Sequence, residues 1–404
     1  MSTANISRIA FATPEYVTEN YFDGGLANYI YRLARALVDL NHDVHVVTLS
    51  EIDRSEFQHQ GVNVHRILTS KAWHTINRLT RYRLTSTTHL LDFSFQVYRK
   101  LKMINSQRPL HLVQFPNSSY CGLASMCFLK VPQLMRASSF QRLLNESTGL
   151  KRTMDLVAQE KLEALTFRLC RHVFAPSLTL RQTLLEHAPV TQIEVIRTPI
   201  YLENNDWDAS VYDQWLRDKN YLLFFGRFEI NKGFHTLVQA LPEFFEQQPD
   251  AYAAMVGRDM RTPLGPSMID YARQQLGRFT DRVVFIDKVH HAQLYPIISG
   301  ARLVVLPSLM DNLPNACLES MALGKVVIGT LGASFDEVIV DGENGFLVKA
   351  GDPEHLAEKI CQVWANPALD EIGRAAKDKA QEFSPEQTIP ALLNYYETVI
   401  QEFE

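Results

Sequence analysis

The chain has 404 residues, of which 46% are hydrophobic and 21% charged, a composition typical of soluble globular proteins. Its length predicts two or three domains. The net charge of −5 argues against general nucleic-acid binding, so we expect no nucleic-acid partner.

No apolar run approaches the roughly 20 residues that cross a bilayer, and residues 1–8 lack a signal-peptide pattern. No cluster of histidines and cysteines predicts a metal site. The odd number of scattered cysteines indicates buried free thiols in a reducing compartment. We therefore expect a cytoplasmic protein. The five cysteines are Cys121, Cys127, Cys170, Cys317 and Cys361.

The chain begins with a pattern that predicts a βαβ unit. Apolar runs predict strands over residues 8–12 and 43–49, and helical periodicity predicts a helix over residues 26–40 between them. Gly24 and Gly25 precede this helix, at the helix terminus where phosphates bind well. A tight turn alone would also explain two glycines.

Residues 70–108 are predicted to be helical, and the stretch 71–108 is rich in basic and aromatic side chains. A solvated helix face with core aromatics explains this pattern most simply. The same pattern also fits peripheral contact with an anionic membrane surface or with a phosphorylated acceptor.

The rest of the first half keeps alternating, which predicts one doubly wound domain over residues 1–200. Its further strands are predicted over residues 62–67, 111–115, 131–135, 172–175 and 193–196, and its helices over residues 122–128, 150–171 and 179–186.

A polar segment, residues 198–208, is the predicted linker to a second α/β domain over residues 201–384. The final helix, residues 385–403, needs a surface on which to bury its apolar face. The second domain's strands are predicted over residues 221–225, 251–256, 282–286, 303–306, 326–328 and 345–347, with helices starting near residues 233, 266, 291, 315, 336 and 353.

Two cations lie on the loop that follows the first strand of the second domain. Arg227 and Lys232 stand at the sheet edge where ligands bind in open α/β folds, and Gly233 permits close backbone approach. Two such cations would clamp a diphosphate and neutralise it as a leaving group. The alternative is a solvated loop whose charges are paired with Glu229.

Two carboxylates mark the strand–loop–helix segment over residues 306–324. Asp311 is predicted on the loop and Glu319 on the helix, roughly 10 Å apart along its axis. That separation would let the two carboxylates bind two parts of one long ligand. It is too large for an acid/base pair that shares one proton. An ordinary turn with a solvated Asp and a surface Glu would look the same.

These motifs together resemble the retaining glycosyltransferases of family four. The resemblance rests on the loops at 226–233 and 311–324, on the tail over residues 332–353, and on Gly24 with Gly25. It is strong over residues 221–360, thinner over residues 8–50 and weak between residues 68 and 190.

The resemblance implies the GT-B fold of the glycogen-synthase-like superfamily: two facing Rossmann-like domains of the α/β class, with the final helix, residues 385–404, crossing back to the first domain. A nucleoside-diphosphate sugar, with UDP or GDP as the nucleotide, would lie mainly on the second domain. Arg227 and Lys232 would bind the diphosphate, and Glu319 the ribose hydroxyls. Further donor contacts are implied for Gly24, Gly25, Val289, Asp311, Asn312, Leu313 and Asn315.

Two positions depart from the family pattern. Position 311 is usually Glu and is Asp here, and Ser138 stands where members often carry a His that contacts the donor sugar. Both changes bear on which sugar is held.

The resulting prediction is a retaining, metal-independent glycosyltransferase with no cofactor. It would move a sugar to a hydroxyl of a glycan, a lipid-linked acceptor or a small-molecule glycoside. A non-catalytic nucleotide-sugar-binding subunit and a nucleotide-sugar epimerase remain as alternatives. An NAD-dependent dehydrogenase is disfavoured, because the third glycine of the dinucleotide fingerprint is missing.

Overall fold

The computed structural model describes residues 7–20, 25–70, 72–147, 152–202 and 207–403. The chain divides into two compact units. Unit 1 comprises Met1–Pro199 together with Thr388–Glu404, and unit 2 comprises Ile200–Gln387. Both are α/β units built on a mainly parallel sheet, which confirms the predicted fold class.

Unit 1 contains an eight-stranded sheet, counted over its described residues, in the order β3-β4-β2-β1-β5-β6-β7-β8. All neighbours pair in parallel except β3 and β4. The strands are β1 (Arg8–Thr13), β2 (Asp43–Leu49), β3 (Glu56–His59), β4 (Val62–Ile67), β5 (Leu112–Pro116), β6 (Gln133–Arg136), β7 (Val173–Ala175) and β8 (Glu194–Val195).

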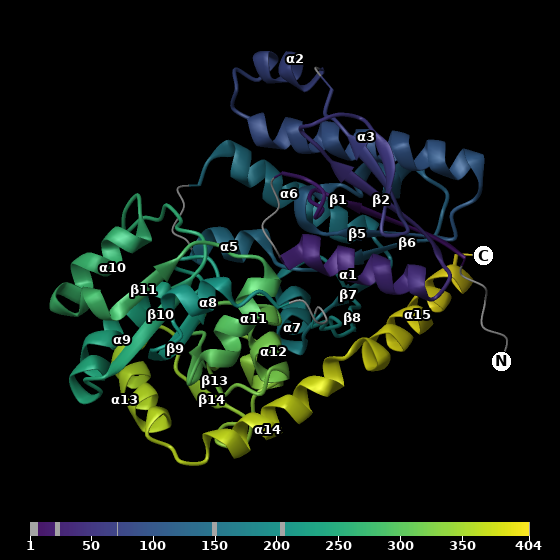
Figure 1. Cartoon of the computed structure of the whole chain (residues 1–404). Helices are drawn as coiled ribbons and strands as arrows, with labels where there is room; N and C mark the ends of the chain where they lie inside the picture. The colour runs from purple at the N-terminus through teal and green to yellow at the C-terminus, as the bar shows by residue number, and fades with distance from the viewer. Residues whose placement is uncertain (1–6, 21–24, 71, 148–151, 203–206, 404) are drawn as a thin grey trace. The chain divides into compact units, whose positions relative to one another are not determined.

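Helices cover both faces of this sheet, as the alternation of side chains along β1 requires. Ile9 and Phe11 pack against α1 and α15, whereas Ala10 and Ala12 pack on the side of α3 (Figure 1). The helices are α1 (Gly25–Asp39), α2 (Ala72–Leu79), α3 (Thr85–Gln107), α4 (Leu123–Phe128), α5 (Gln141–Ser147), α6 (Met154–Leu169), α7 (Leu178–His187) and α15 (Pro385–Gln401).

The last helix, α15, buries its apolar face in unit 1. Leu392, Tyr396 and Val399 join the core formed by α1 and the sheet, and the Tyr396 hydroxyl donates to Gln114 Oε1 on β5 at 2.5 Å. The chain therefore ends on the same unit in which it begins.

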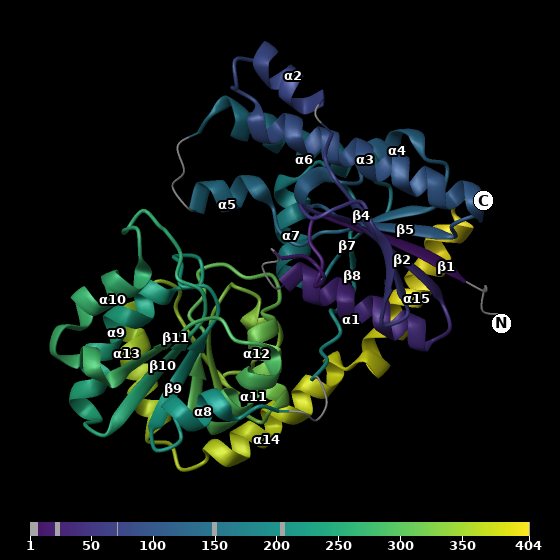
Figure 2. The same ribbon diagram turned by 45° about the horizontal axis from the view of Figure 1, so that its top comes forward.

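Unit 2 has a six-stranded parallel sheet, again counted over the described residues, in the order β11-β10-β9-β12-β13-β14. Figure 2 shows helices on both sides of it. The elements are β9 (Asn220–Phe225), β10 (Ala251–Val256), β11 (Val283–Ile286), β12 (Leu303–Val305), β13 (Val327–Thr330), β14 (Phe346–Val348), α8 (Ser210–Trp215), α9 (Phe234–Gln247), α10 (Met268–Leu276), α11 (His291–Gly300), α12 (Asn315–Ala322), α13 (Pro353–Trp364) and α14 (Leu369–Ala380).

Some predicted elements were wrong in type or extent. The long helix expected over residues 70–108 is two helices, because Arg81 and Tyr82 between them adopt left-handed backbone angles. The helix expected near residue 336 is only a short 3-10 turn, Phe335–Glu337. The helix expected over residues 150–171 begins at Met154, within its described part.

Other elements were missed. The antiparallel hairpin of β3 and β4 turns through Gln60 and Gly61, both with positive φ, and such turns twist as the flanking strands do. Helices α5, α8 and α14 were not predicted either. None of these elements carries the candidate site, because the parallel strands place its loops at one edge of the unit 2 sheet.

Candidate functional site

Two loops meet at the carboxyl edge of the unit 2 sheet. Gly233, at the start of α9, has a left-handed backbone with φ 66°, and a Cβ there would lie 1.8 Å from the Pro307 carbonyl oxygen. The Leu309 N–H donates to the Asn231 carbonyl at 2.9 Å. Any side chain at position 233 would therefore push apart the loop after β9 and the loop after β12.

An ion pair joins the two loops through their predicted site residues. Lys232 Nζ lies 2.6 Å from Asp311 Oδ2, and the two side chains are 32% and 14% exposed. Asp311 is itself fixed, since its Oδ1 accepts from the Asn312 N–H at 3.0 Å and its carbonyl accepts from the Ser334 hydroxyl at 3.2 Å. The structure thus brings together one cation and one acid that lie 79 positions apart in sequence.

The second predicted cation has a local partner. Arg227 Nη2 lies 2.9 Å from Glu229 Oε1, and the arginine side chain is 41% exposed. This is the pairing that the alternative interpretation of the loop expected. Both cations of the predicted clamp are therefore held by carboxylates, with the loop geometry already formed.

Glu319 is buried on α12, with 4% of its surface exposed. Its Oε1 lies 3.5 Å from Nε2 of His291, the first residue of α11. The alternative of a surface Glu is therefore wrong. His291 was not predicted as a site residue, although it follows Val289, for which the sequence predicted a donor contact, by only two positions.

The remaining predicted positions divide between the units. In unit 2, Val289, Asn312 and Asn315 are half-buried and Leu313 is buried. In unit 1, Gly25 is the exposed first residue of α1, and Gly24 lies outside the described residues.

Ser138 lies in unit 1 on the loop after β6 and is half-buried. Its Oγ accepts from Arg136 Nη1 at 2.7 Å, and its N–H donates to Asn117 Oδ1 at 2.8 Å. Arg136 was not recognised from the sequence, although it immediately follows the strand predicted at residues 131–135. Ser138, where the resemblance implies a histidine in other members, therefore contacts a buried cation.

Beneath this loop lies the buried carboxylate of Glu163, from α6. It accepts from Asn117 Nδ2 and from the Gln141 N–H, both at 3.0 Å. Burial raises the pKa of Glu163 to about 7, against the lowering effect of these hydrogen bonds. Glu163 and Asn117 gave no signal in the sequence, because their roles depend on contacts between segments far apart in the chain.

Two features are absent from the described residues. In that part of the chain, no three His, Cys, Asp or Glu side chains gather as a metal site would require. None of the described helices is both long and apolar enough to span a bilayer.

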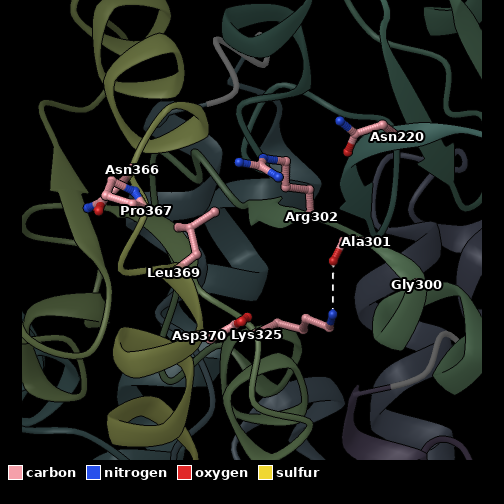
Figure 3. Close-up of a pocket in the computed structure, with 9 residues that line it drawn as sticks. All are labelled: Asn220, Gly300, Ala301, Arg302, Lys325, Asn366, Pro367, Leu369 and Asp370. Atoms are coloured by element: carbon pink, nitrogen blue, oxygen red, sulfur yellow. Dashed lines mark hydrogen bonds between the residues drawn. The ribbon is translucent and has the colours of Figure 1, made fainter.

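A hollow of about 350 Å³ lies at the opposite edge of the unit 2 sheet from these loops (Figure 3). Asn220 begins β9, while Arg302 and Lys325 stand just before β12 and β13, so this hollow opens at the amino ends of the strands. Lys325 Nζ donates to the Ala301 carbonyl at 2.9 Å. The hollow is separate from the site formed by the loops at the carboxyl edge.

Comparison with known proteins agrees with this architecture. The family profile described as "Glycosyl transferases group 1" matches residues 219–366, and the profile "Glycosyltransferase Family 4" matches residues 23–204. An uncharacterised glycosyltransferase of Methanocaldococcus jannaschii is 24% identical over 98% of this chain and 99% of its own length. Alignments with the gpi3 subunit of phosphatidylinositol N-acetylglucosaminyltransferase from Schizosaccharomyces pombe and with D-inositol 3-phosphate glycosyltransferase from Segniliparus rotundus span only 65% and 39% of those proteins' lengths.

Solved structures share the fold at low sequence identity. Sucrose-phosphate synthase from Thermosynechococcus elongatus has a TM-score of 0.76 at 19% identity, covering 98% of this chain and 100% of that one. HepE from Anabaena, solved with UDP and glucose, has a TM-score of 0.72 at 16% identity, covering 97% and 100%.

Two Rossmann-like units with mainly parallel sheets, together with the likeness to these solved structures, define the GT-B fold. The two profile matches, over residues 23–204 and 219–366, make the chain a glycosyltransferase of the family-four type, and the full-length relative is also a glycosyltransferase.

The raised pKa of Glu163 predicts a pH-dependent stability. Its folded pKa of about 7 lies above the ordinary glutamate value of 4.5, so between these values the folded protein binds the proton more tightly than the unfolded chain. The free energy of unfolding must therefore decrease as pH rises through this range. Relative to Glu163→Gln, we expect wild type to lose about 1 kcal/mol between about pH 6 and pH 8, measured by urea unfolding.

Glu186→Gln, at an exposed position on α7, is the matched control and should follow the wild-type pH dependence. Parallel curves for wild type and Glu163→Gln would show that the Glu163 carboxyl does not titrate in this range.

Proposed function

We propose that this glycosyltransferase uses a nucleoside-diphosphate sugar, with UDP or GDP as the nucleotide, and retains the configuration of the transferred sugar. The observation that carries the proposal is the Lys232–Asp311 ion pair at the crossing of two loops. It supports a donor site on unit 2, at the carboxyl edge where open α/β sheets bind ligands.

The two ion pairs suggest how the diphosphate would enter. Lys232 and Arg227 are each held by a carboxylate, of Asp311 and Glu229 respectively, so their positions are fixed before the donor arrives. A diphosphate carries more charge than one carboxylate and would compete for both cations. Asp311, once released from Lys232, would be available to the hydroxyls of the transferred sugar.

Glu319 has a separate role in this proposal. Its buried position beside His291 supports an assignment to the ribose hydroxyls, because a carboxylate oriented by a neighbour can accept from a diol. His291 would act as a positioning residue for Glu319. Val289, two positions before His291, would lie near the base.

For the transfer step, we propose departure of the nucleoside diphosphate with its developing charge stabilised by Arg227 and Lys232. The acceptor hydroxyl attacks the anomeric carbon from the same face and passes its proton to the leaving phosphate oxygen. The bond from that carbon to phosphate breaks as the new glycosidic bond forms. Electrostatic preorganisation carries the rate in this scheme, and neither a protein nucleophile nor a metal ion takes part.

The acceptor is proposed to be a glycan, a lipid-linked molecule or a small glycoside. A surface of unit 1 supports peripheral contact with an anionic membrane. Phe95 on α3 and Phe128 on α4 are 47% and 66% exposed, and both rings lie within about 6 Å of the Tyr98 ring. Lys102 Nζ lies 5.8 Å from the same ring, and Arg99 is exposed beside it. Aromatic and basic side chains in one patch suit the headgroup region of a bilayer.

The donor proposal predicts that Lys232→Ala slows sugar transfer on the order of 100-fold, because a charge facing the leaving group is lost. A panel of UDP and GDP sugars, screened by the shift in melting temperature, first identifies the donor. Release of nucleoside diphosphate with acceptor, in buffer containing EDTA, then gives the rate.

Lys377→Ala, at an exposed position on α14, is the matched control and should leave the rate unchanged. Wild-type rates in Lys232→Ala would contradict the donor site, and loss of turnover in EDTA would contradict metal independence. Conversion of the donor sugar to an epimer without acceptor would instead favour the epimerase alternative.

The membrane proposal predicts that the double variant Arg99→Gln with Lys102→Gln binds vesicles of phosphatidylcholine and phosphatidylserine about 30-fold more weakly, at roughly 1 kcal/mol per charge. Vesicle sedimentation at two salt concentrations measures this. The variant Lys349→Gln with Lys377→Gln loses the same charge from unit 2 and should bind as wild type does. Equal weakening in both variants would show that net charge, and not this surface, determines binding.

A further inference from the structure

Arg136 is a buried cation at the end of β6, with only 9% of its surface exposed. Its Nη2 donates to Thr198 Oγ1 at 2.9 Å and its Nη1 to Ser138 Oγ at 2.7 Å, whereas Nε has no hydrogen-bond partner within the described part of the chain. Arginine is seldom buried without a paired carboxylate.

The surroundings of this guanidinium are neutral. Its carbon lies 4.1 Å from the centre of the Tyr29 ring on α1, and the Tyr29 hydroxyl accepts from Gln114 Nε2 at 3.3 Å. Over the described ranges, no Asp or Glu oxygen lies within 4.0 Å of Arg136. Burial lowers the pKa of Arg136, yet a guanidinium stays protonated at neutral pH, so a full positive charge remains.

Stacking on an aromatic ring and donation to two hydroxyls satisfy the geometry of the guanidinium without neutralising its charge. A buried charge without a counter-ion is costly, and replacing such a group by an apolar one is often neutral or stabilising. The stability of unit 1 therefore does not explain why an arginine stands at position 136.

The loop beside Arg136 is held firmly and is not sealed from solvent. Asn117 fixes it by accepting from the Ser138 N–H and donating to the Ser139 carbonyl, each at 2.8 Å. Ser138 and Ser139 are half-buried, so their surface remains partly accessible. Because Ser138 Oγ joins this surface to the Arg136 guanidinium, the positive charge lies close to it, which favours an oxyanion there.

We propose that Arg136 and Ser138 form a subsite for an oxyanion carried by a substrate, and that the acceptor is therefore phosphorylated. This inference rests on the proposed function: the donor's diphosphate and ribose bind unit 2, so we assign the oxyanion on unit 1 to the acceptor. The same chemistry would suit a carboxylate on the donor sugar, as in a uronic acid, and the experiment separates the two sources.

The first measurement is the melting temperature of the full chain in saturating UDP, which occupies the donor diphosphate site. Inorganic phosphate, compared with chloride at equal ionic strength, is expected to raise the melting temperature further. Arg136→Met should weaken phosphate binding at least tenfold and should melt no lower than wild type without ligand, since an unpaired buried charge is removed. If Arg136 has only a structural role, Arg136→Met should keep any response to phosphate and should melt at a lower temperature than wild type.

Two further variants keep the test decisive if Arg136→Met does not fold. Arg136→Lys retains a charge and should keep phosphate binding within tenfold of wild type, whereas Ser138→Ala retains the guanidinium and should weaken binding severalfold. A wild-type response to phosphate that is unchanged in Ser138→Ala would overturn the subsite.

The second measurement compares UDP-glucuronic acid with UDP-glucose by calorimetry. A phosphorylated acceptor predicts that wild type binds both donors alike. A tenfold preference for the glucuronic acid donor, lost in Arg136→Met and kept in Arg136→Lys, would assign the oxyanion to the donor and overturn the acceptor assignment. No response to phosphate and no such preference would overturn the subsite itself. Failure of both UDP and GDP to raise the melting temperature would count against the proposed donor site alone.

Discussion

The contact between two loops at the carboxyl edge of the unit 2 sheet is the constraint on which the candidate site depends. Gly233 lets the loop after β9 touch the carbonyl of Pro307, and only then can Lys232 reach Asp311 at 2.6 Å. A side chain at position 233 would separate the loops and leave Lys232 without that partner. One backbone conformation thus fixes the relative placement of the two loops that carry the sequence resemblance.

The parallel sheet explains why these particular loops meet. Strands β9 and β12 are neighbours in unit 2 although 77 residues, 226–302, lie between the end of β9 and the start of β12. Their carboxyl ends face the same edge, so a cation after one strand and an acid after the other converge. The helix that follows the second loop, α12, then buries Glu319 against His291 at the same edge.

Much of this architecture could be predicted from local patterns. Apolar runs located every strand of unit 2, and the loop residues Arg227, Lys232 and Asp311 were recognised by charge and position. What could not be predicted depends on contacts between distant segments. Glu163 and His291 became apparent only through their partners, and the break at Arg81 is a backbone feature that helical periodicity does not reveal.

The two candidate anion sites differ in how their cations are paired. In unit 2, the cations already have carboxylate partners, so a diphosphate would replace one anion by another. In unit 1, Arg136 has only neutral partners among the described residues, so an anionic ligand would supply a charge that the fold does not. A family-four glycosyltransferase built in this way would hold an anionic group on each unit.

The most direct test of the central claim is the affinity of the protein for UDP and for UMP, measured by calorimetry in wild type and in Lys232→Ala. If Lys232 binds the terminal phosphate, wild type prefers UDP strongly, and Lys232→Ala loses most of that preference while its affinity for UMP changes little. A Lys232→Ala protein that keeps the full preference for UDP would contradict the account.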